Sequence, residues 1–222
     1  MSTFPFSMVG FDLDGTLVDT KGDLGVAVNH GLGLVGRERV PLDKVVEMIG
    51  GGTLRMLERA LEVTGGPLPE AEFNKLYDET LSYYEAHIAD LSRPYPGCVE
   101  ALEALAELGC SLAVVTNKPE RLAARLLDEL DMLGRFAAVI GGDTAARKKP
   151  HPDPIELAIV RSGGGGQFAM VGDSSFDVAS ARAAGVPVVV LGFGYNDRPA
   201  RELRADAVVD HFDQLVETLR TL

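Results

Sequence analysis

Short apolar runs alternate with amphipathic helical patterns through most of the second half of the chain. Buried strands are predicted for the apolar runs at residues 7–11, 111–116, 136–141, 168–173 and 186–192. A last strand at 207–209, followed by a helix over about 212–220, is expected at one edge. Strands that alternate with helices are typical of βαβ units. The pattern therefore predicts an α/β fold with a doubly wound, parallel, Rossmann-like sheet of at least five strands.

The predicted helices of this region have apolar residues at steps of three and four positions. Asp153 and Pro154 are interpreted as the N-cap and first turn of one helix, and Gly185 as the residue that ends another. Gly10 lies inside the first strand, where the missing side chain would permit close packing. The run of glycines at 163–166 is interpreted as a flexible surface loop with no part in phosphate binding.

Residues 20–93 have a different pattern, with helical periodicity and no convincing strand. Pro94 and Pro96 interrupt any helix at the end of this region. We therefore predict a core formed by residues 1–19 and 94–222, with an all-helical cap inserted at 20–93. Because the insertion begins just after the first strand, it should cover the carboxyl ends of the strands, where open α/β sheets bind ligands.

Composition and charge narrow the possible partners. The chain has 222 residues, 46% of them hydrophobic, and its 21 basic and 33 acidic side chains give a net charge of −12. Such a surface repels nucleic acid and anionic lipid, so neither nucleic acid nor a membrane is expected as a partner. No apolar run is long enough to span a bilayer. The oligomeric state is not readable from the sequence.

The start of the chain and its cysteines predict a cytoplasmic protein. The first residues lack a basic segment, and Asp12 interrupts their apolar run before it reaches the length of a signal peptide. Cys98 and Cys110 have no metal-like spacing and are expected to be reduced thiols. A disulfide between them is the less favoured alternative.

Four polar clusters follow the predicted strands. They are Asp12 with Asp14, Thr116 with Asn117 and Lys118, Lys148 with Lys149, and Asp173 with Asp177. Taken singly, each could be a turn, a helix cap or a solvated loop. On one edge of a parallel sheet, however, the carboxylates would repel one another unless a cation lay between them, and hard oxygen ligands favour Mg²⁺. A hydroxyl, an amide and an ammonium opposite them could hold a phosphoryl group.

The same clusters carry a family resemblance. The stretches "DLDGTLVDT", "VVTNKP", "KKPHPDP" and "VGDSSFDVASARAAG" resemble, in order, the four motifs of the haloacid dehalogenase superfamily. The helical insertion resembles the C1 cap of that superfamily, so the resemblance covers essentially the whole chain. It implies phosphoryl transfer, because Asp14 is present and the dehalogenases of the superfamily lack this second aspartate.

The resemblance also implies roles for the residues that match. Asp12 would be the nucleophile that forms an aspartyl-phosphate, and Asp14 the general acid and base. Asp12, the backbone carbonyl of Asp14 and Asp173 would bind Mg²⁺, and Asp177 would orient a metal-bound water. Asp19 is expected to cap the first cap helix or to lie at its hinge.

Phosphate binding is assigned by the same resemblance to Thr116, Asn117 and Lys149. Thr116 would donate a hydrogen bond to the phosphoryl oxygens, and Lys149 would neutralise charge on them and on Asp12. Lys148 is the competing candidate, but the "KPHP" register favours Lys149.

The cap stretch "MIGGGTLRMLERAL" resembles the phosphoglycolate phosphatases, which implies a small phosphorylated metabolite, most simply 2-phosphoglycolate, as substrate. Residues 50–52 could bring backbone close to the substrate or form only a turn. Arg55 could reach a substrate carboxylate or be an exposed helix residue. The alternatives are a sugar-phosphate mutase like β-phosphoglucomutase, although His30 lies later than the histidine of those relatives, and a non-catalytic binding or regulatory module.

Overall fold

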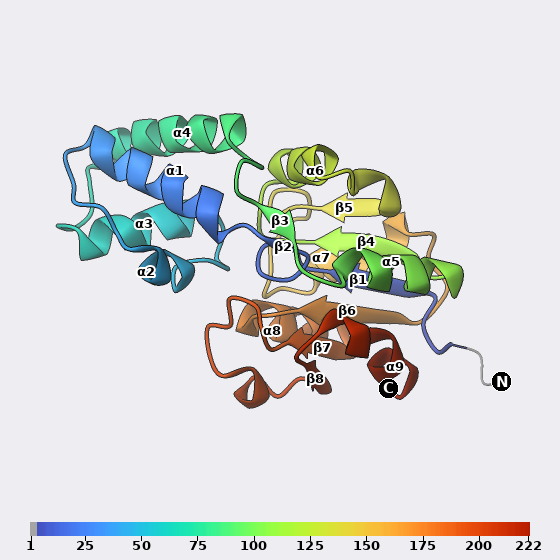
Figure 1. Ribbon diagram of the computed structural model, residues 1–222. Coiled ribbons are helices and arrows are strands. Elements are labelled where there is room, and N and C mark those ends of the chain that lie inside the picture. Colours follow the sequence, from blue (N-terminus) through green and yellow to red (C-terminus); the bar gives the residue numbers. More distant parts are fainter. Residues whose placement is uncertain (1–3) are drawn as a thin grey trace.

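The main sheet has six parallel strands in the order β5-β4-β1-β6-β7-β8 (Figure 1). The computed structural model describes residues 4–222. Its main-sheet strands are β1 (Met8–Phe11), β4 (Ser111–Val115), β5 (Ala138–Ile140), β6 (Phe168–Gly172), β7 (Val188–Leu191) and β8 (Ala207–Val209). From β1 the chain runs outward through β4 and β5, then returns to β6 and runs outward on the other side. The carboxyl end of β1 therefore lies at the point where the strand order reverses, which is the usual ligand site of such sheets.

Helices cover both faces of this sheet. The apolar side chains of α5 (Cys98–Glu107), α6 (Glu120–Glu129) and α9 (Leu215–Arg220) share one cluster with one face of the strands. Those of α7 (Asp153–Arg161) and α8 (Ser175–Ala184) share a second cluster with the opposite face. Short 3₁₀ turns occupy Leu133–Arg135, Ala200–Glu202 and Phe212–Gln214. The predicted doubly wound α/β fold is confirmed.

The predicted strands are all present, and each begins and ends within two residues of its predicted limits. Gly10 lies in β1 directly against the ring of Phe168 in the neighbouring strand, so the close packing expected of it is confirmed. Gly185 ends α8 with a left-handed backbone, as predicted. Cys98 and Cys110 are buried free thiols.

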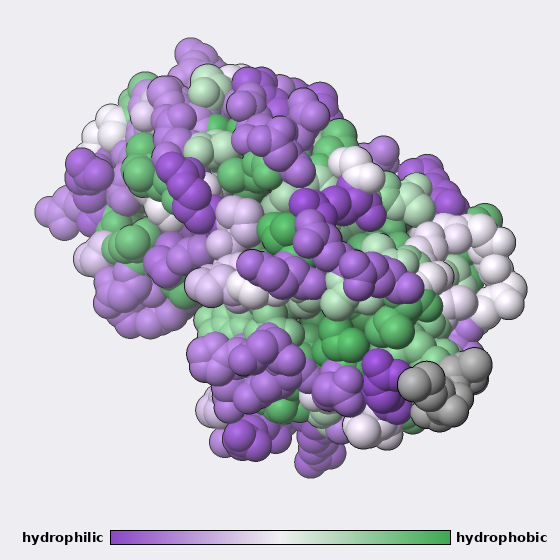
Figure 2. Space-filling model, turned by 45° about the vertical axis from the view of Figure 1, so that its right-hand side comes forward, coloured by the Kyte–Doolittle hydropathy of each residue, from purple (hydrophilic) through white to green (hydrophobic). Residues whose placement is uncertain are grey.

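Four helices lie between β2 (Val18–Asp19) and β3 (Arg93–Pro94), namely α1 (Lys21–Leu34), α2 (Leu42–Val46), α3 (Thr53–Val63) and α4 (Glu70–Ala86). We refer to them as the four-helix segment. Figure 1 shows this segment beside the carboxyl edge of the sheet, joined to the core by β2 and β3. Hydrophilic residues predominate over the visible face of the molecule, with apolar patches between them (Figure 2).

The antiparallel pair of β2 and β3 was not predicted from the sequence. Each strand has only two residues, too few for a periodic pattern to show. Pro94 lies in β3 and pairs with Val18, so it belongs to a strand at the root of the four-helix segment. The two chain connections to the segment are thereby held side by side.

Two helix caps differ from their predictions. Pro152, not Asp153, is the N-cap of α7; Asp153 is the first helical residue and pairs with Arg147. Thr20 occupies the N-cap of α1, whereas Asp19 ends β2 at the root of the four-helix segment, which is the hinge position predicted as its alternative. Asp19 accepts hydrogen bonds there from Lys21 and from Tyr195. In each case the carboxylate pairs with a basic side chain: Arg147 for Asp153 and Lys21 for Asp19. The sequence pattern does not reveal these pairings.

None of the helices within residues 4–222 combines the length and apolar character needed to cross a bilayer. The glycines at 163–166 form the connection between α7 and the start of β6. They therefore lie at the amino ends of the parallel strands, whereas Asp12 lies at the carboxyl ends. This position agrees with a surface loop that takes no part in phosphate binding.

The packing of α1 against α4 predicts opposite effects for two substitutions in one helix. A Cβ at Gly31 would overlap the buried Oγ1 of Thr80, whereas a Cβ at Gly33 would meet nothing. Gly33→Ala should raise the free energy of unfolding by about 0.4–1 kcal/mol. Gly31→Ala should lower it by about 1–3 kcal/mol, since the overlap outweighs the same gain in helix propensity.

Urea unfolding of both variants measures this difference. The added substitution Thr80→Ala should recover most of the loss in Gly31→Ala, because it removes the overlapping atom. Equal stability of the Gly31→Ala and Gly33→Ala variants would contradict the observed packing.

Candidate active site

A tight loop after β1 carries the first two predicted site residues. The carbonyl of Leu13 accepts hydrogen bonds from the backbone N–H groups of the three residues at 16–18, which turns the chain directly after Asp12. Gly15 has a φ of 85°, and a Cβ there would lie 2.5 Å from a carboxylate oxygen of Asp173 and 2.7 Å from the ring of Tyr195. Glycine is therefore required both by the backbone conformation and by the close approach of the neighbouring loops.

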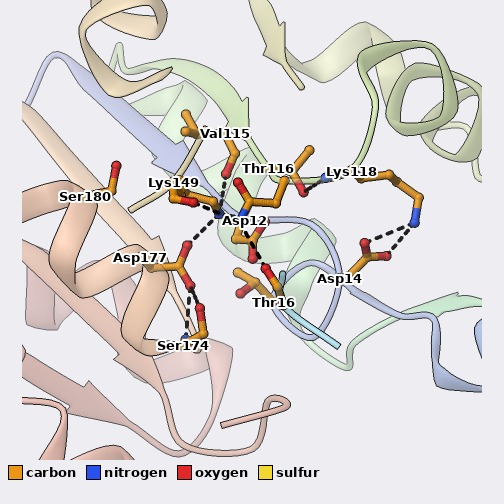
Figure 3. Close-up of polar contacts among 12 residues, drawn as sticks. Asp12, Asp14, Thr16, Val115, Thr116, Lys118, Lys149, Ser174, Asp177 and Ser180 are labelled. Carbon is orange, nitrogen blue, oxygen red and sulfur yellow. Dashed lines mark hydrogen bonds and ion pairs between the residues drawn. The ribbon is translucent and has the colours of Figure 1, made fainter. Parts of the chain in front are cut away.

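Lys149 joins two carboxylates beneath the loop. Its Nζ lies 2.6 Å from Oδ1 of Asp177 and 3.0 Å from Oδ1 of Asp12, and it donates to the carbonyl of Val115 at 2.8 Å (Figure 3). The lysine side chain is 1% exposed. Of the two candidate lysines, Lys149 is thus the one that reaches Asp12; Lys148 donates instead to the carbonyl of Gly51 at 2.9 Å.

Asp177 fixes the loop between β6 and α8. Its Oδ2 accepts hydrogen bonds from the backbone N–H groups of Asp173 and Ser174 and from the Ser174 hydroxyl, at 3.2, 3.0 and 2.6 Å. With Ser174 as the N-cap, this forms a capping box at the start of α8. Both oxygens of Asp177 are therefore already engaged, which is consistent with an orienting role.

Asp173 is held from two other loops. Its Oδ1 accepts from the hydroxyl of Thr16 at 2.9 Å, and its Oδ2 accepts from the backbone N–H of Tyr195 at 2.6 Å. The hydroxyl of Tyr195 in turn donates to Asp19 at 2.6 Å and accepts from the backbone N–H groups of Thr20 and Lys21 at 2.6 and 2.8 Å. Tyr195 thus connects Asp173 to the start of α1.

Carboxylate oxygens of Asp12, Asp173 and Asp177 lie within 4.8 Å of one another, all from buried residues. Burial raises the pKa of Asp12 to about 6, even though the charge of Lys149 opposes this effect. Burial, followed by the charges of Asp177 and Asp12, raises the pKa of Asp173 well above its ordinary value. Oδ1 of Asp12 is buried and accepts no hydrogen bond of good geometry within residues 4–222. This donor set and its uncompensated charge fit a divalent cation.

The side chain of Asp14 is directed away from that cluster (Figure 3). Its two oxygens lie 2.9 and 3.0 Å from Nζ of Lys118, and Oδ1 also accepts from the hydroxyl of Thr20 at 2.8 Å. In this conformation Asp14 faces the four-helix segment. The loop brings Asp12 and Asp14 to the same cavity wall but gives their carboxylates different partners.

Thr116 and Asn117 follow β4 and differ in what they offer. The hydroxyl of Thr116 accepts from the N–H of Lys118 at 3.2 Å and can still donate its own hydrogen. The side-chain amide of Asn117 donates to the carbonyls of Gly50 and Lys149 at 3.0 and 3.2 Å. Thr116 is therefore free to contact a phosphoryl oxygen, whereas the amide of Asn117 holds the loop before α3 in place.

A small cavity separates these loops from the four-helix segment. It is lined from the core by Asp12, Asp14, Thr116, Asn117 and Lys118, and from the four-helix segment by Leu24, Ile49, Gly50, Gly52, Thr53 and Met56. Its volume is about 20 Å³, which is space for about one water molecule. The protein is thus in a closed conformation, and a phosphate ester can enter only if the two parts move apart.

Sequence reasoning placed Lys118 in a cluster without giving it a function, and it missed Thr16, Tyr84 and Tyr195. Nζ of Lys118 lies 4.7 Å from the centre of the Tyr84 ring, which comes from α4. Tyr84 lies amid a regular helical pattern, and Tyr195 stands 22 residues from Asp173. The motif stretches "DLDGTLVDT" and "VVTNKP" contain Thr16 and Lys118, but their pattern does not reveal the partners of either residue.

Comparison with known proteins gives close relatives over nearly the whole length. The chain is 42% identical to a phosphoglycolate phosphatase of Agrobacterium fabrum, over 99% of this chain and 95% of the relative. It is 40% identical to a phosphoglycolate phosphatase of Mesorhizobium japonicum, over 96% and 94% of the two chains.

Solved structures agree with these sequence relatives. A crystal structure described as a predicted phosphoglycolate phosphatase from Haemophilus somnus has a TM-score of 0.91 and 34% identity, covering 96% of this chain and 98% of the other. The fold is also that of CbbY from Rhodobacter sphaeroides, with a TM-score of 0.77 at 23% identity, over 95% and 96% of the two chains. Residues 9–191, which include all four polar clusters, match the haloacid dehalogenase-like hydrolases, and the chain belongs to that family.

Proposed function

We propose that this hydrolase is a Mg²⁺-dependent phosphatase that cleaves a small phosphomonoester, most simply 2-phosphoglycolate, through an aspartyl-phosphate on Asp12. The observation that carries the proposal is the position of Asp12, which meets Lys149 and Asp173 at the wall of a small closed cavity. The names of the relatives at about 40% identity support the substrate.

Asp12, Asp173 and the backbone carbonyl of Asp14 would hold the metal ion, as the resemblance implies. Asp177 would remain an orienting residue, because both of its oxygens already accept hydrogen bonds. The bound ion would neutralise charge between the carboxylates and the phosphoryl oxygens, so that an anionic nucleophile can approach an anionic ester.

In the first step, a carboxylate oxygen of Asp12 attacks phosphorus, and the bond from phosphorus to the ester oxygen breaks. Lys149 keeps the Asp12 side chain in position, and the hydroxyl of Thr116 donates to a phosphoryl oxygen. The departing alkoxide takes a proton from Asp14, which turns from Lys118 toward the substrate and takes up that proton from solvent before it passes it on.

In the second step, water attacks phosphorus and passes its proton to Asp14. The bond between phosphorus and Asp12 breaks, which restores the carboxylate and releases inorganic phosphate. Asp14 therefore ends the cycle in the state in which it began.

Opening and closing of the four-helix segment would admit substrate and exclude water. A few polar contacts join the segment to the core. Asn117 and Lys148 donate hydrogen bonds to the carbonyls of Gly50 and Gly51, and Arg121 of α6 pairs with Glu85 of α4. A few such polar contacts can break and re-form quickly, as is common for lids over enzyme sites.

The nucleophile assignment predicts the effect of Asp12→Asn. An amide cannot form the acyl-phosphate, so turnover of 2-phosphoglycolate should fall by roughly 10³-fold or more. Release of inorganic phosphate measures the effect, and circular dichroism checks the fold. Asp128→Asn, an exposed change on α6, is the matched control and should retain wild-type turnover. Comparable rates for the Asp12→Asn variant and the control would refute the mechanism.

The metal assignment predicts a change in thermal stability that does not depend on activity. At about 100 times its dissociation constant, Mg²⁺ should stabilise the wild-type protein by about 2.7 kcal/mol, or roughly 5–10 °C in Tm. The shift should disappear with EDTA and in Asp173→Asn, whose amide is a weaker ligand. An equal shift in Asp173→Asn and wild type would exclude Asp173 as a ligand.

The reaction type is tested by following the product. A phosphatase should release inorganic phosphate stoichiometrically from 2-phosphoglycolate, with a higher kcat/KM than for hexose phosphates or nucleotides. A mutase would instead return an isomerised sugar phosphate. His30 is exposed and stacks on Tyr83, with ring centres 3.9 Å apart, and does not line the cavity, which favours the phosphatase. Isomerised product as the main outcome would reverse this assignment.

A further inference from the structure

Lys118 is a buried cation with one anionic partner. Its side chain is 1% exposed, and Asp14 is the carboxylate with which it pairs in the part of the chain that the structure describes. The ring of Tyr84 covers the ammonium from α4, with 4.7 Å between Nζ and the ring centre. A buried charge without a partner is costly, so Lys118 needs an anion in every state of the reaction cycle.

Lys118 also lies on the cavity wall. Lys118 is the one cationic side chain among the described residues that line the cavity. Lys149 lies below Asp12, and Lys148 contacts the loop before α3 from outside the cavity. Arg55, the other candidate for a substrate carboxylate, pairs with Glu58 and has a side chain that is 58% exposed. The helix α3 begins at Thr53 on the facing wall, and its N-terminus adds positive potential to the cavity.

We propose that Lys118 determines substrate specificity by binding a carboxylate that the substrate carries next to its ester oxygen, in the place that the Asp14 carboxyl occupies in the closed protein. The proposal rests on the proposed phosphatase function and assigns the residue that would recognise the carboxylate of its substrate.

The position of Asp14 fixes where that carboxylate falls. To protonate the departing oxygen, the Asp14 carboxyl must come within about 2.6–3.2 Å of it. Because Asp14 starts 2.9 Å from Nζ of Lys118, the carbon groups on that oxygen lie next to the ammonium. A carboxylate one carbon away from the ester oxygen can reach it, and the apolar side chains of Leu24, Ile49 and Met56 line the facing side of the cavity.

An exchange of partners explains how the substrate could release Asp14. When Asp14 turns to the ester oxygen, it withdraws its carboxyl from Lys118. A substrate carboxylate then takes its place, so the buried ammonium stays paired. An ester with a neutral leaving group leaves Lys118 without an anion at that moment, and its transition state is correspondingly less stable.

The test compares kcat/KM for 2-phosphoglycolate with that for 2-hydroxyethyl phosphate, an ester of nearly the same size in which a neutral hydroxymethyl group replaces the carboxylate. Wild type should prefer the carboxylate ester by about 10²-fold or more, the range expected when a buried charged partner is lost. In Lys118→Met the ratio should fall to within about 10-fold of unity, with most of the loss on 2-phosphoglycolate. Lys118→Arg should restore much of the preference.

Arg55→Met is the matched control, since it removes a nearby cation outside the cavity. It should keep the wild-type ratio. The Mg²⁺-dependent rise in Tm checks that the Lys118 variants are folded; if Lys118→Met fails to fold, the wild-type ratio together with Lys118→Arg and Arg55→Met decides.

Three results would overturn the proposal: a wild-type ratio near unity, an unchanged ratio in Lys118→Met, or a collapse of the ratio in Arg55→Met. Each of them leaves a working phosphatase. Failure to hydrolyse any ester would instead reject the proposed function itself, so the two failures are distinguishable.

Discussion

Repulsion among the carboxylates of Asp12, Asp173 and Asp177, which meet in a buried space beside one ammonium group, is the constraint on which the site depends. Burial strengthens this repulsion because it removes the screening effect of water. The surrounding groups hold the carboxylates together nevertheless: Lys149 bridges Asp12 and Asp177, and the Thr16 hydroxyl and the backbone N–H of Tyr195 hold Asp173. A site built in this way fits the divalent cation of the proposed function.

A second buried ion pair, between Asp14 and Lys118, links this site to the four-helix segment. The aromatic ring of Tyr84 closes over Lys118 from α4, while Tyr195 ties Asp173 to the start of α1. The helical segment is therefore linked to both Lys118 and Asp173, in addition to its polar contacts with Asn117, Lys148 and Arg121. Movement of the segment would change the surroundings of both the predicted general acid and the predicted metal ligand, which connects substrate entry with the chemistry.

Much of the fold and the identity of the site residues could be predicted from the sequence, because both depend on local patterns. Buried strands need continuous apolar runs, and the ends of parallel strands collect polar residues on one edge. Asp12, Lys149 and Asp173 were recognised in this way and do meet. The β2–β3 pair escaped prediction because strands of two residues leave no periodic signal.

The sequence by itself determined the parallel sheet, the helical insertion and the set of chemical groups at the carboxyl edge, because apolar periodicity and motif spacing encode them. Only the tertiary structure decided the partners of those groups. It directed Lys148 to the carbonyl of Gly51 and the amide of Asn117 to the carbonyls of Gly50 and Lys149, and it set Lys118 against Asp14 and Tyr84. Those choices depend on distances between segments far apart in the chain, and such distances exist only once both hydrophobic clusters have formed.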